Sequence, residues 1–248
     1  MIPEIYYSTL AALVGPKDAK TLSDKDKTLK LYHTGQINIP LPSPRVAVVG
    51  SRNSSLQGDQ AATQIAKYLA SKGILVCSGL AKGIDSAAHL GAIKAHGGVT
   101  EAHGTTLAVL GTPIDQPNPQ KRWLKELIGQ RHMLVSQFPS GSPVYPNNFL
   151  QRNQTLAQLT HASIIIEAQQ RSGSLNHARH ALKLGHPLYI YRPLNQNQPW
   201  TKPLITAGAV FFTDPKDITE KLPPQHKGGI NSLDETELFN WQISRQRT

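Results

Sequence analysis

The chain contains a single cysteine and few aromatic residues, and it has no long uninterrupted hydrophobic run. One cysteine cannot form an internal disulfide, and Cys77 lies within an apolar run, so we expect a buried small side chain. No run approaches the roughly 20 apolar residues that a membrane-spanning helix requires. The first residues also lack the basic start and apolar stretch of a secretory signal. The sequence therefore predicts a soluble cytoplasmic protein with no membrane partner.

Several familiar catalytic motifs are missing as well. There is no G-x-G-x-x-G after the strongest apolar run and no G-x-x-x-x-G-K-[ST], which excludes a dinucleotide-binding fingerprint and a P-loop. There is no H-E-x-x-H, and His177 and His180 lack the Cys or carboxylate companions of a zinc site. No G-x-S-x-G nucleophile elbow occurs. We therefore expect no metal, no cofactor and no catalytic residue.

Acidic residues are scarce in the middle of the chain. The formal net charge is +10, yet residues 1–44 carry five lysines against four acidic residues. Residues 214–248 carry five basic residues against six acidic ones. Residues 45–213 therefore hold sixteen Lys and Arg against six Asp and Glu, which is the whole excess. A segment this basic favours a polyanionic partner, and nucleic acid is the first candidate.

A regular alternation of short apolar runs and helical patterns fills this basic region. The first strong run, residues 46–49, is apolar throughout and is followed by a turn and then a helical pattern. Strands are expected near residues 45–50, 73–78, 106–110, 133–136, 162–167 and 187–191. Helices are expected near residues 57–72, 84–95, 120–129, 151–160 and 174–184. This order predicts an α/β fold with a doubly wound, mostly parallel sheet.

The two ends of the chain break the alternation. Residues 1–44 have weak periodicity and three prolines near their end, so we expect a short helix or arm followed by a linker. Residues 45–218 are expected to form the α/β domain, with the apolar patch 209–212 as a last edge strand. Residues 219–248 are expected to form a flexible polar tail with one short helix near residues 233–241.

Glycine, hydroxyl and basic residues follow several of the predicted strands. The carboxyl ends of parallel strands share one edge of the sheet, so these turns form one surface, where such sheets bind ligands. Close backbone approach, helix N-terminal amides and positive charge together favour a phosphate group. The candidate phosphate-binding residues are Gly50, Ser51, Arg52, Gly79, Lys82, Gly83, Gly111, Thr112, Ser172, Gly173 and Ser174. Any one of these turns taken alone is equally well explained as a helix start with a serine cap.

Five blocks occur in a specific order along the sequence: Val49–Arg52, Ser78–His89, Ala108–Asp115, Gln151–Asn153 and Arg171–Leu175. Together they closely resemble the DNA-processing protein A family (DprA/Smf), over most of the chain. The resemblance implies an extended Rossmann-like domain that binds single-stranded DNA in a basic pocket. It also implies loading of the recombinase RecA onto incoming strands during natural transformation, and a homodimer.

The resemblance adds several site residues to those from the turns. The pocket arginine of the family corresponds to Arg52, its R-N pair to Arg152 and Asn153, and its K-R pair to Lys121 and Arg122. The function that the resemblance implies is therefore DNA binding and strand protection rather than catalysis.

Some positions depart from the family pattern. The motif F-P-x-R-N-R reads F-L-Q-R-N-Q at residues 149–154, so a proline and an arginine are lost. The glutamate that the family usually has after its fourth strand is Gln137 here, and the glycine-rich segment 96–103 resembles an insertion. These departures leave the predicted fold intact and weaken the implied role in recombinase loading.

Two other functions stay open at this point. The same superfamily resembles the nucleoside-monophosphate phosphoribohydrolases of the lysine-decarboxylase-like group, which carry P-G-G-x-G-T-x-x-E. The corresponding turn here begins at Arg171 and has no glutamate on the following helix, and the nearest acidic residue is Glu167. A sensor of small nucleotides that uses the same anion-binding turns is the other alternative.

Overall fold

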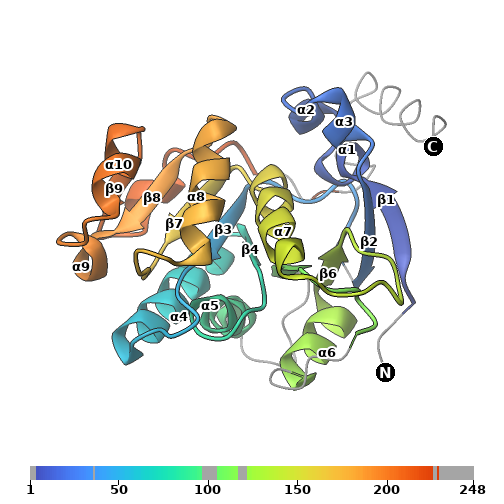
Figure 1. The fold of residues 1–248 in the computed structure, drawn as a ribbon, viewed down its shortest axis with the longest axis horizontal. Helices are drawn as coiled ribbons and strands as arrows, with labels where there is room; N and C mark the ends of the chain where they lie inside the picture. Colours follow the sequence, from blue (N-terminus) through green and yellow to red (C-terminus); the bar gives the residue numbers. More distant parts are fainter. Residues whose placement is uncertain (1–3, 36, 97–104, 117–121, 226–227, 229–248) are drawn as a thin grey trace.

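The computed structural model describes residues 4–35, 37–96, 105–116, 122–225 and 228 (Figure 1). Its described strands form one sheet in the order β1-β2-β6-β5-β4-β3-β7-β8-β9. Neighbouring strands from β6 through to β9 are parallel, whereas β1 and β2 join antiparallel at one end. The strands are β1 Tyr6–Thr9, β2 Lys30–Gly35, β3 Arg45–Val49, β4 Leu75–Ser78, β5 Thr106–Leu110, β6 Met133–Ser136, β7 Ala162–Ile165, β8 Leu188–Tyr191 and β9 Val210–Phe212.

Helices cover both faces of this sheet. The longer ones are α4 Leu56–Ser71, α5 Ile84–Ile93, α6 Arg122–Arg131, α7 Pro146–Gln158 and α8 Gly173–Lys183. The shorter ones are α1 Leu10–Val14, α2 Pro16–Ala19, α3 Asp24–Lys27, the 3-10 turn η1 Lys94–His96, α9 Arg192–Asn195, α10 Thr201–Thr206 and α11 Lys216–Thr219. Apolar residues of α4 and α5 pack on one face together with those of α6, and residues of α7, α8 and α1 pack on the other.

The central strand β3 shows why the chain folds into these layers. Val46 and Val48 face the core under α4 and α5, whereas Ala47 and Val49 face the opposite core. All four side chains are at most 4% exposed, so both faces of the strand are buried. A strand that is apolar on both faces fits only the interior of a sheet with helices on each side. The predicted α/β fold with a mostly parallel sheet is therefore confirmed.

The predicted strands and helices agree with the structure to within a few residues, with one larger difference. Helix α7 begins at Pro146, five residues before the predicted start at residue 151. Proline is favoured at the first helical position because its missing N–H would have no partner there. The edge strand expected in residues 209–212 is β9. The tail helix expected near residues 233–241 and most of the glycine-rich segment 96–104 lie outside the described residues.

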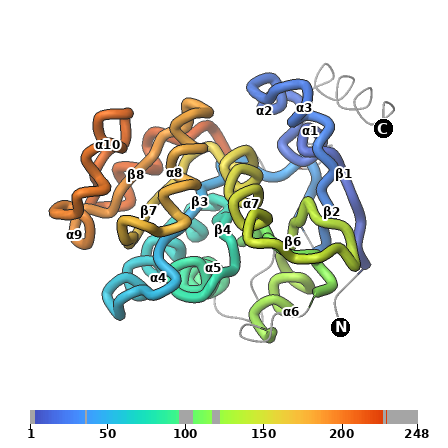
Figure 2. The backbone as a smooth tube through the Cα atoms, in the orientation of Figure 1, coloured from blue at the N-terminus to red at the C-terminus, as the bar shows by residue number. Residues whose placement is uncertain are grey.

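Residues 1–44 differ from the predicted arm. Strand β2 pairs with β6, β1 pairs with β2, and the helix between them buries Leu10, Leu13 and Val14. Figure 2 shows this N-terminal segment at one end of the chain trace and β8 at the other. The segment thus extends the sheet, because its short strands become stable only when β6 supplies a partner edge.

A buried ion-pair cluster fixes the N-terminal segment on the sheet. Arg45 is 1% exposed and its guanidinium pairs with Asp18. Nε2 of His161 lies 2.8 Å from the same carboxylate, and Nδ1 accepts from the backbone N–H of Arg45 at 3.0 Å. The hydrogen bond from His161 and the positive charge of Arg45 hold the pKa of Asp18 well below its usual range despite burial. The cluster therefore anchors α2 to the start of β3 and the end of α7.

The order in which strands are added to the sheet reverses between β3 and β7, although the two strands are parallel. From β3 the chain builds outward through β4, β5 and β6, and it then returns to start β7 on the other side of β3. The helices that follow β3 and β7 therefore begin on opposite sides and leave a crevice between them. Ligands of doubly wound sheets bind at such a switch point, beyond the carboxyl ends of the strands. Within the described residues, no helix has the length and apolar character needed to cross a membrane.

Candidate nucleic-acid interface

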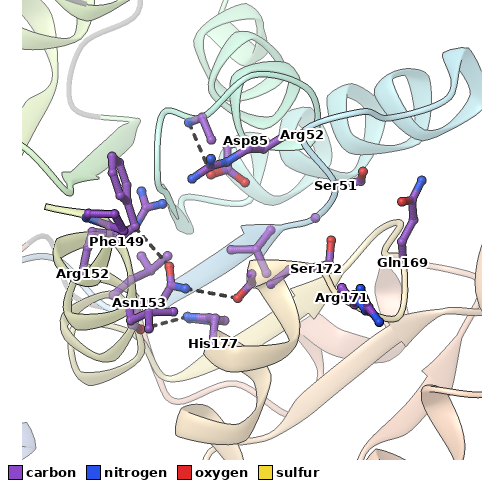
Figure 3. Close-up of a pocket in the computed structure, with 18 of the residues that line it drawn as sticks. Ser51, Arg52, Asp85, Phe149, Arg152, Asn153, Gln169, Arg171, Ser172 and His177 are labelled. Atoms are coloured by element: carbon purple, nitrogen blue, oxygen red, sulfur yellow. Dashed lines mark hydrogen bonds between the residues drawn. The ribbon is translucent and has the colours of Figure 1, made fainter.

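A pocket of about 710 Å³ occupies the switch point (Figure 3). It is bordered by the turn after β3, the start of α5, the start of α7 and the turn before α8. The predicted residues that line it are Gly50, Ser51, Arg52, Arg152, Asn153, Ser172, Gly173 and Ser174. The fold thus brings together turns that are more than 100 positions apart in the sequence.

The remaining candidate residues lie elsewhere. Thr112 donates to the neighbouring Pro113 carbonyl at 3.3 Å, and the exposed Arg122 pairs with Glu126 at 3.0 Å. Lys82 is exposed in the turn before α5, and Lys121 lies outside the described residues. Gly79, Gly83 and Gly111 do not line the pocket either.

Two of these glycines are explained by packing. A Cβ atom on Gly79 would lie 1.8 Å from Nη1 of Arg152, and one on Gly111 would lie 2.6 Å from Cδ1 of Phe149. Both distances are impossible for real atoms, so the glycines leave room for two α7 side chains that line the pocket. These glycines therefore shape the pocket indirectly, through the positions of Arg152 and Phe149.

The N-terminus of α8 opens into the pocket with unsatisfied hydrogen-bonding groups. Ser172 is the N-cap residue, yet its side chain makes no capping hydrogen bond. The Ser174 residue is 8% exposed, and its Oγ has no hydrogen-bond partner among the described residues. Free amides of the first helical turn and the helix dipole both favour an anion at this point. Arg171, exposed just before the helix, adds a positive charge (Figure 3).

The turn after β3 places Arg52 across the pocket from this helix. The Ser51 N–H donates to the Glu167 carbonyl at 2.7 Å, and Ser51 Oγ accepts from the Asn53 N–H at 3.1 Å. The backbone on both sides of Arg52 is therefore fixed, while the arginine itself is exposed. Its guanidinium carbon lies 5.3 Å from the centre of the Phe149 ring. This cation–π contact orients the side chain and leaves its N–H groups available to a ligand.

Arg152 has a different environment from Arg52. It is 5% exposed, and its Nη1 donates to the carbonyls of Gly79 and of Val109, the latter at 2.9 Å. Its Nε donates to Oδ1 of Asn153 at 3.1 Å. A buried arginine with these partners joins α7 to the ends of β4 and β5. The structure therefore makes Arg152 a brace of the pocket wall, in addition to any contact with a ligand.

One carboxylate also lines the pocket. Asp85 is 6% exposed near the start of α5, and one of its oxygens accepts from the Ala81 N–H at 3.4 Å. Burial raises the pKa of this carboxyl above its usual value, while the charge of Arg152 opposes the rise. The acid thus offsets the buried arginine and leaves Arg52 and Arg171 as the cations at the mouth.

Hydrogen bonds of His177 and Asn153 join α7 to α8 and β7. Nδ1 of His177 lies 3.1 Å from the Asn153 carbonyl, and Nε2 lies 2.9 Å from Ser163 Oγ. Burial lowers the pKa of His177 to about 4, so the imidazole is neutral at physiological pH. The Asn153 amide donates to the Gly173 carbonyl at 3.1 Å. This network sets the spacing of the two helices and supplies no charge.

Glu167, the acidic residue nearest the α8 turn in sequence, faces another helix. Its Oε2 accepts from both the backbone N–H and the Oγ of Ser55, each at 2.9 Å. Ser55 is the N-cap of α4, so the carboxylate stabilises the start of that helix. It is therefore committed to a structural contact. The described residues contain no cluster of His, Cys, Asp or Glu suited to a metal ion.

The sequence did not single out the apolar side of the pocket. Tyr145 and Leu150 are 58% and 47% exposed, and both line the pocket next to Phe149. The signal that was overlooked is Pro146, which moves the start of α7 upstream and makes these residues part of its first turns.

These features define a Rossmann-like α/β protein with arginines at the mouth of its switch-point pocket. The chain belongs to the DNA recombination-mediator protein A family, whose model matches residues 14–223. It is 34% identical over 208 residues to Protein Smf of Escherichia coli K12, which covers 81% of this chain and 53% of that protein. It is 36% identical over 197 residues to DNA processing protein DprA of Streptococcus pneumoniae, covering 78% of this chain and 66% of that protein.

A solved structure supports the same relationship. DNA processing protein A from Helicobacter pylori, reported for its single-stranded DNA binding mode, superposes with a TM-score of 0.71 at 26% identity. The match covers 86% of this chain and 94% of that one. The chain spans 53% and 66% of the lengths of the E. coli and S. pneumoniae relatives. The family prediction from the five sequence blocks is confirmed.

Proposed function

We propose that this chain binds single-stranded DNA in the switch-point pocket, without turnover, as part of DNA processing during natural transformation. The observation that carries the proposal is the start of α8, where a buried Ser174 hydroxyl lacks a partner and the helix lacks a side-chain cap. A phosphate oxygen accepts hydrogen bonds from such a hydroxyl and from the first helical amides.

The charges around the pocket suit a phosphate backbone rather than an isolated anion. Arg52 and Arg171 stand at two sides of the mouth, and the whole positive excess of the chain lies between residues 45 and 213. The aromatic ring of Phe149, on α7, lines the same pocket beside Arg52, where a base would stack. The anion-binding helix start and the arginines suit the phosphate of one nucleotide, and the Phe149 ring suits its base.

A single strand fits this arrangement better than a duplex does. The hydroxyl of Ser174 is inside the pocket, and a duplex presents its phosphates on a wide, stiff cylinder. A flexible strand can turn one phosphate inward and leave its base free to stack. The sequence of the bases matters little in such a contact, because phosphate contacts carry no sequence information.

The resemblance to the family extends the proposal to partners. RecA and a second copy of the chain are the partners it predicts, and a role on incoming DNA places the protein in the cytoplasm. The hydrolase alternative is less well supported, because Glu167 binds Ser55 at the start of α4 instead of facing the α8 turn.

Fluorescence anisotropy with labelled oligonucleotides tests the proposal. The parent chain should bind an oligothymidylate more tightly than a duplex of equal length. The logarithm of the binding constant should fall with the logarithm of salt by about 0.7 for each phosphate contact. Equal or tighter binding of the duplex, or binding that does not depend on salt, would refute the proposal.

A further inference from the structure

The exposed aromatic residues of the described chain gather on one flank of the pocket. Tyr6, Tyr7, Trp123 and Tyr145 are each more than half exposed, at 53%, 62%, 54% and 58%. Exposed rings on a soluble surface lose favourable burial and usually mark a contact site. We call these four residues the aromatic flank. Their positions in the sheet show that they share one edge.

Two members of the aromatic flank lie at the starts of helices. Tyr145 is the N-cap residue of α7 and lines the pocket itself. Trp123 is the second residue of α6, which follows β5. Helices that follow parallel strands begin at the carboxyl edge of the sheet. Both rings therefore stand on the edge where the pocket opens.

The strand register brings the other two members to the same edge. Tyr32 of β2 pairs with Ser136, the last residue of β6, and Tyr7 of β1 pairs with Tyr32. Tyr7 thus stands level with the carboxyl end of β6, and β1 runs in the same direction as β6 because both are antiparallel to β2. Tyr6 lies one position further in, on the opposite face of the sheet from Tyr7, and stacks on His33 with the ring centres 6.1 Å apart.

A lysine accompanies these rings. Nζ of Lys30 lies 3.8 Å from the centre of the Tyr7 ring and 5.3 Å from that of Tyr32. Lys30 pairs with Thr9, beyond the end of β6, and is exposed. Interleaved cations and aromatic rings are the usual surface for the phosphates and bases of a single strand. The positive charge beside Tyr7 is thus complementary to the ligand proposed for the pocket, whereas the Tyr6 hydroxyl donates to the Glu4 carboxylate at 2.9 Å.

The opposite flank offers nothing similar within the described residues. Phe211 is partly buried under the guanidinium of Arg192, whose carbon is 5.0 Å from the ring centre. The exposed large apolar side chains away from the aromatic flank are Leu56 at the start of α4, at 71%, and Val210 on β9, at 50%, and neither is aromatic. Figure 1 shows β1 and β9 at opposite ends of the molecule. A strand leaving the pocket therefore finds stacking partners in one direction only.

We infer that a bound single strand continues from the pocket over α7 and α6 toward β1, with bases stacked on the aromatic flank. This inference rests on the proposed function and adds a path and a direction to it. The span from β3 to β1 is five strand spacings of about 4.8 Å, or about 24 Å. At about 3.4 Å per nucleotide, the rise in a duplex, this path takes up to about seven nucleotides.

The span provides a test by oligonucleotide length. An oligothymidylate of about 4 nucleotides fills the pocket alone, and one of about 16 also reaches β1. The variant Tyr7→Ala/Trp123→Ala should bind the short oligonucleotide like the parent and the long one at least about fivefold more weakly. Tyr7→Phe/Trp123→Phe keeps both rings and should restore binding of the long oligonucleotide. Val210→Ala, at the opposite flank, should change neither affinity.

The outcomes separate this inference from the proposed function. If the parent binds both oligonucleotides and the double alanine variant binds the long one equally well, the path is wrong while the pocket stands. Equal losses for both lengths also overturn the path, because they indicate an effect on the pocket. If the parent binds neither oligonucleotide, the proposed function itself fails.

Discussion

Arg52 provides the sharpest test of the pocket. The arginine is exposed, its backbone is fixed on both sides, and its guanidinium lies over the Phe149 ring. A charge-assisted hydrogen bond is worth about 1.5 to 3 kcal/mol, and solvent exposure favours the lower end of that range. Arg52→Glu removes this contact and adds repulsion between the new carboxylate and phosphate. We expect single-stranded DNA to bind at least about tenfold more weakly.

Two further readouts follow from the geometry. Arg52→Lys keeps the charge and loses the planar fork, so its affinity should fall between those of the parent and Arg52→Glu. The slope of affinity against salt should become shallower by about 0.7 in Arg52→Glu, because one phosphate contact is lost. The free energy of unfolding should change by no more than about 1 kcal/mol, since the substitution removes an exposed cation–π contact and an exposed charge that acts on the Asp85 carboxyl.

Anisotropy titrations at several salt concentrations, with thermal melts of each variant, measure all of these quantities. Lys202→Glu is the matched control, because Lys202 is an exposed cation on α10 outside the pocket. Parent-like DNA binding by Arg52→Glu would show that the arginine is a bystander. A large loss of thermal stability would make it a structural residue. Either result would place the DNA site elsewhere.

Other predictions concern the stability of the pocket walls. Arg152→Ala leaves the buried carbonyls of Gly79 and Val109 without their donor, at about 1 to 3 kcal/mol each, so it should lower the free energy of unfolding by about 2 to 6 kcal/mol in denaturant titrations; parent-like stability would contradict its role as a brace. Glu167→Gln should lower the free energy of unfolding by about 1 kcal/mol, because it weakens the hydrogen bonds at the start of α4. Chromatography should detect no free base released from nucleoside monophosphates by the parent or by this variant. Base release by the parent that is absent in the variant would instead favour a hydrolase. Burial lowers the pKa values of His89 and His177 to about 3 and about 4. The unfolded chain therefore takes up protons first, below about pH 6.5, and stability should fall as pH drops from there to about 4; denaturation midpoints that stay constant over this window would contradict buried neutral imidazoles.

The sequence identified the arginines of the site but did not show which of them is exposed and which is buried. Arg52 and Arg152 were both predicted to contact phosphate, and both line the pocket. Only the structure distinguishes them, because the partners of Arg152 are carbonyls of Gly79 and Val109, which are distant in sequence. The glycines after the strands were assigned to the approach of a phosphate. Gly79 and Gly111 instead make room for side chains of α7.

The sequence by itself determined the parallel core and the composition of the turns. Strands buried on both faces have an apolar pattern that is visible locally, and glycine, serine and arginine at their ends mark the ligand-binding edge. Only the tertiary structure shows that the weakly patterned N-terminal segment forms two strands of the sheet. Strands β1 and β2 are short and mixed in character, so they form only because β6 offers a free edge. The same pairing sets Tyr7 and Lys30 level with the pocket, since cross-strand register depends on contacts between distant segments and not on local sequence.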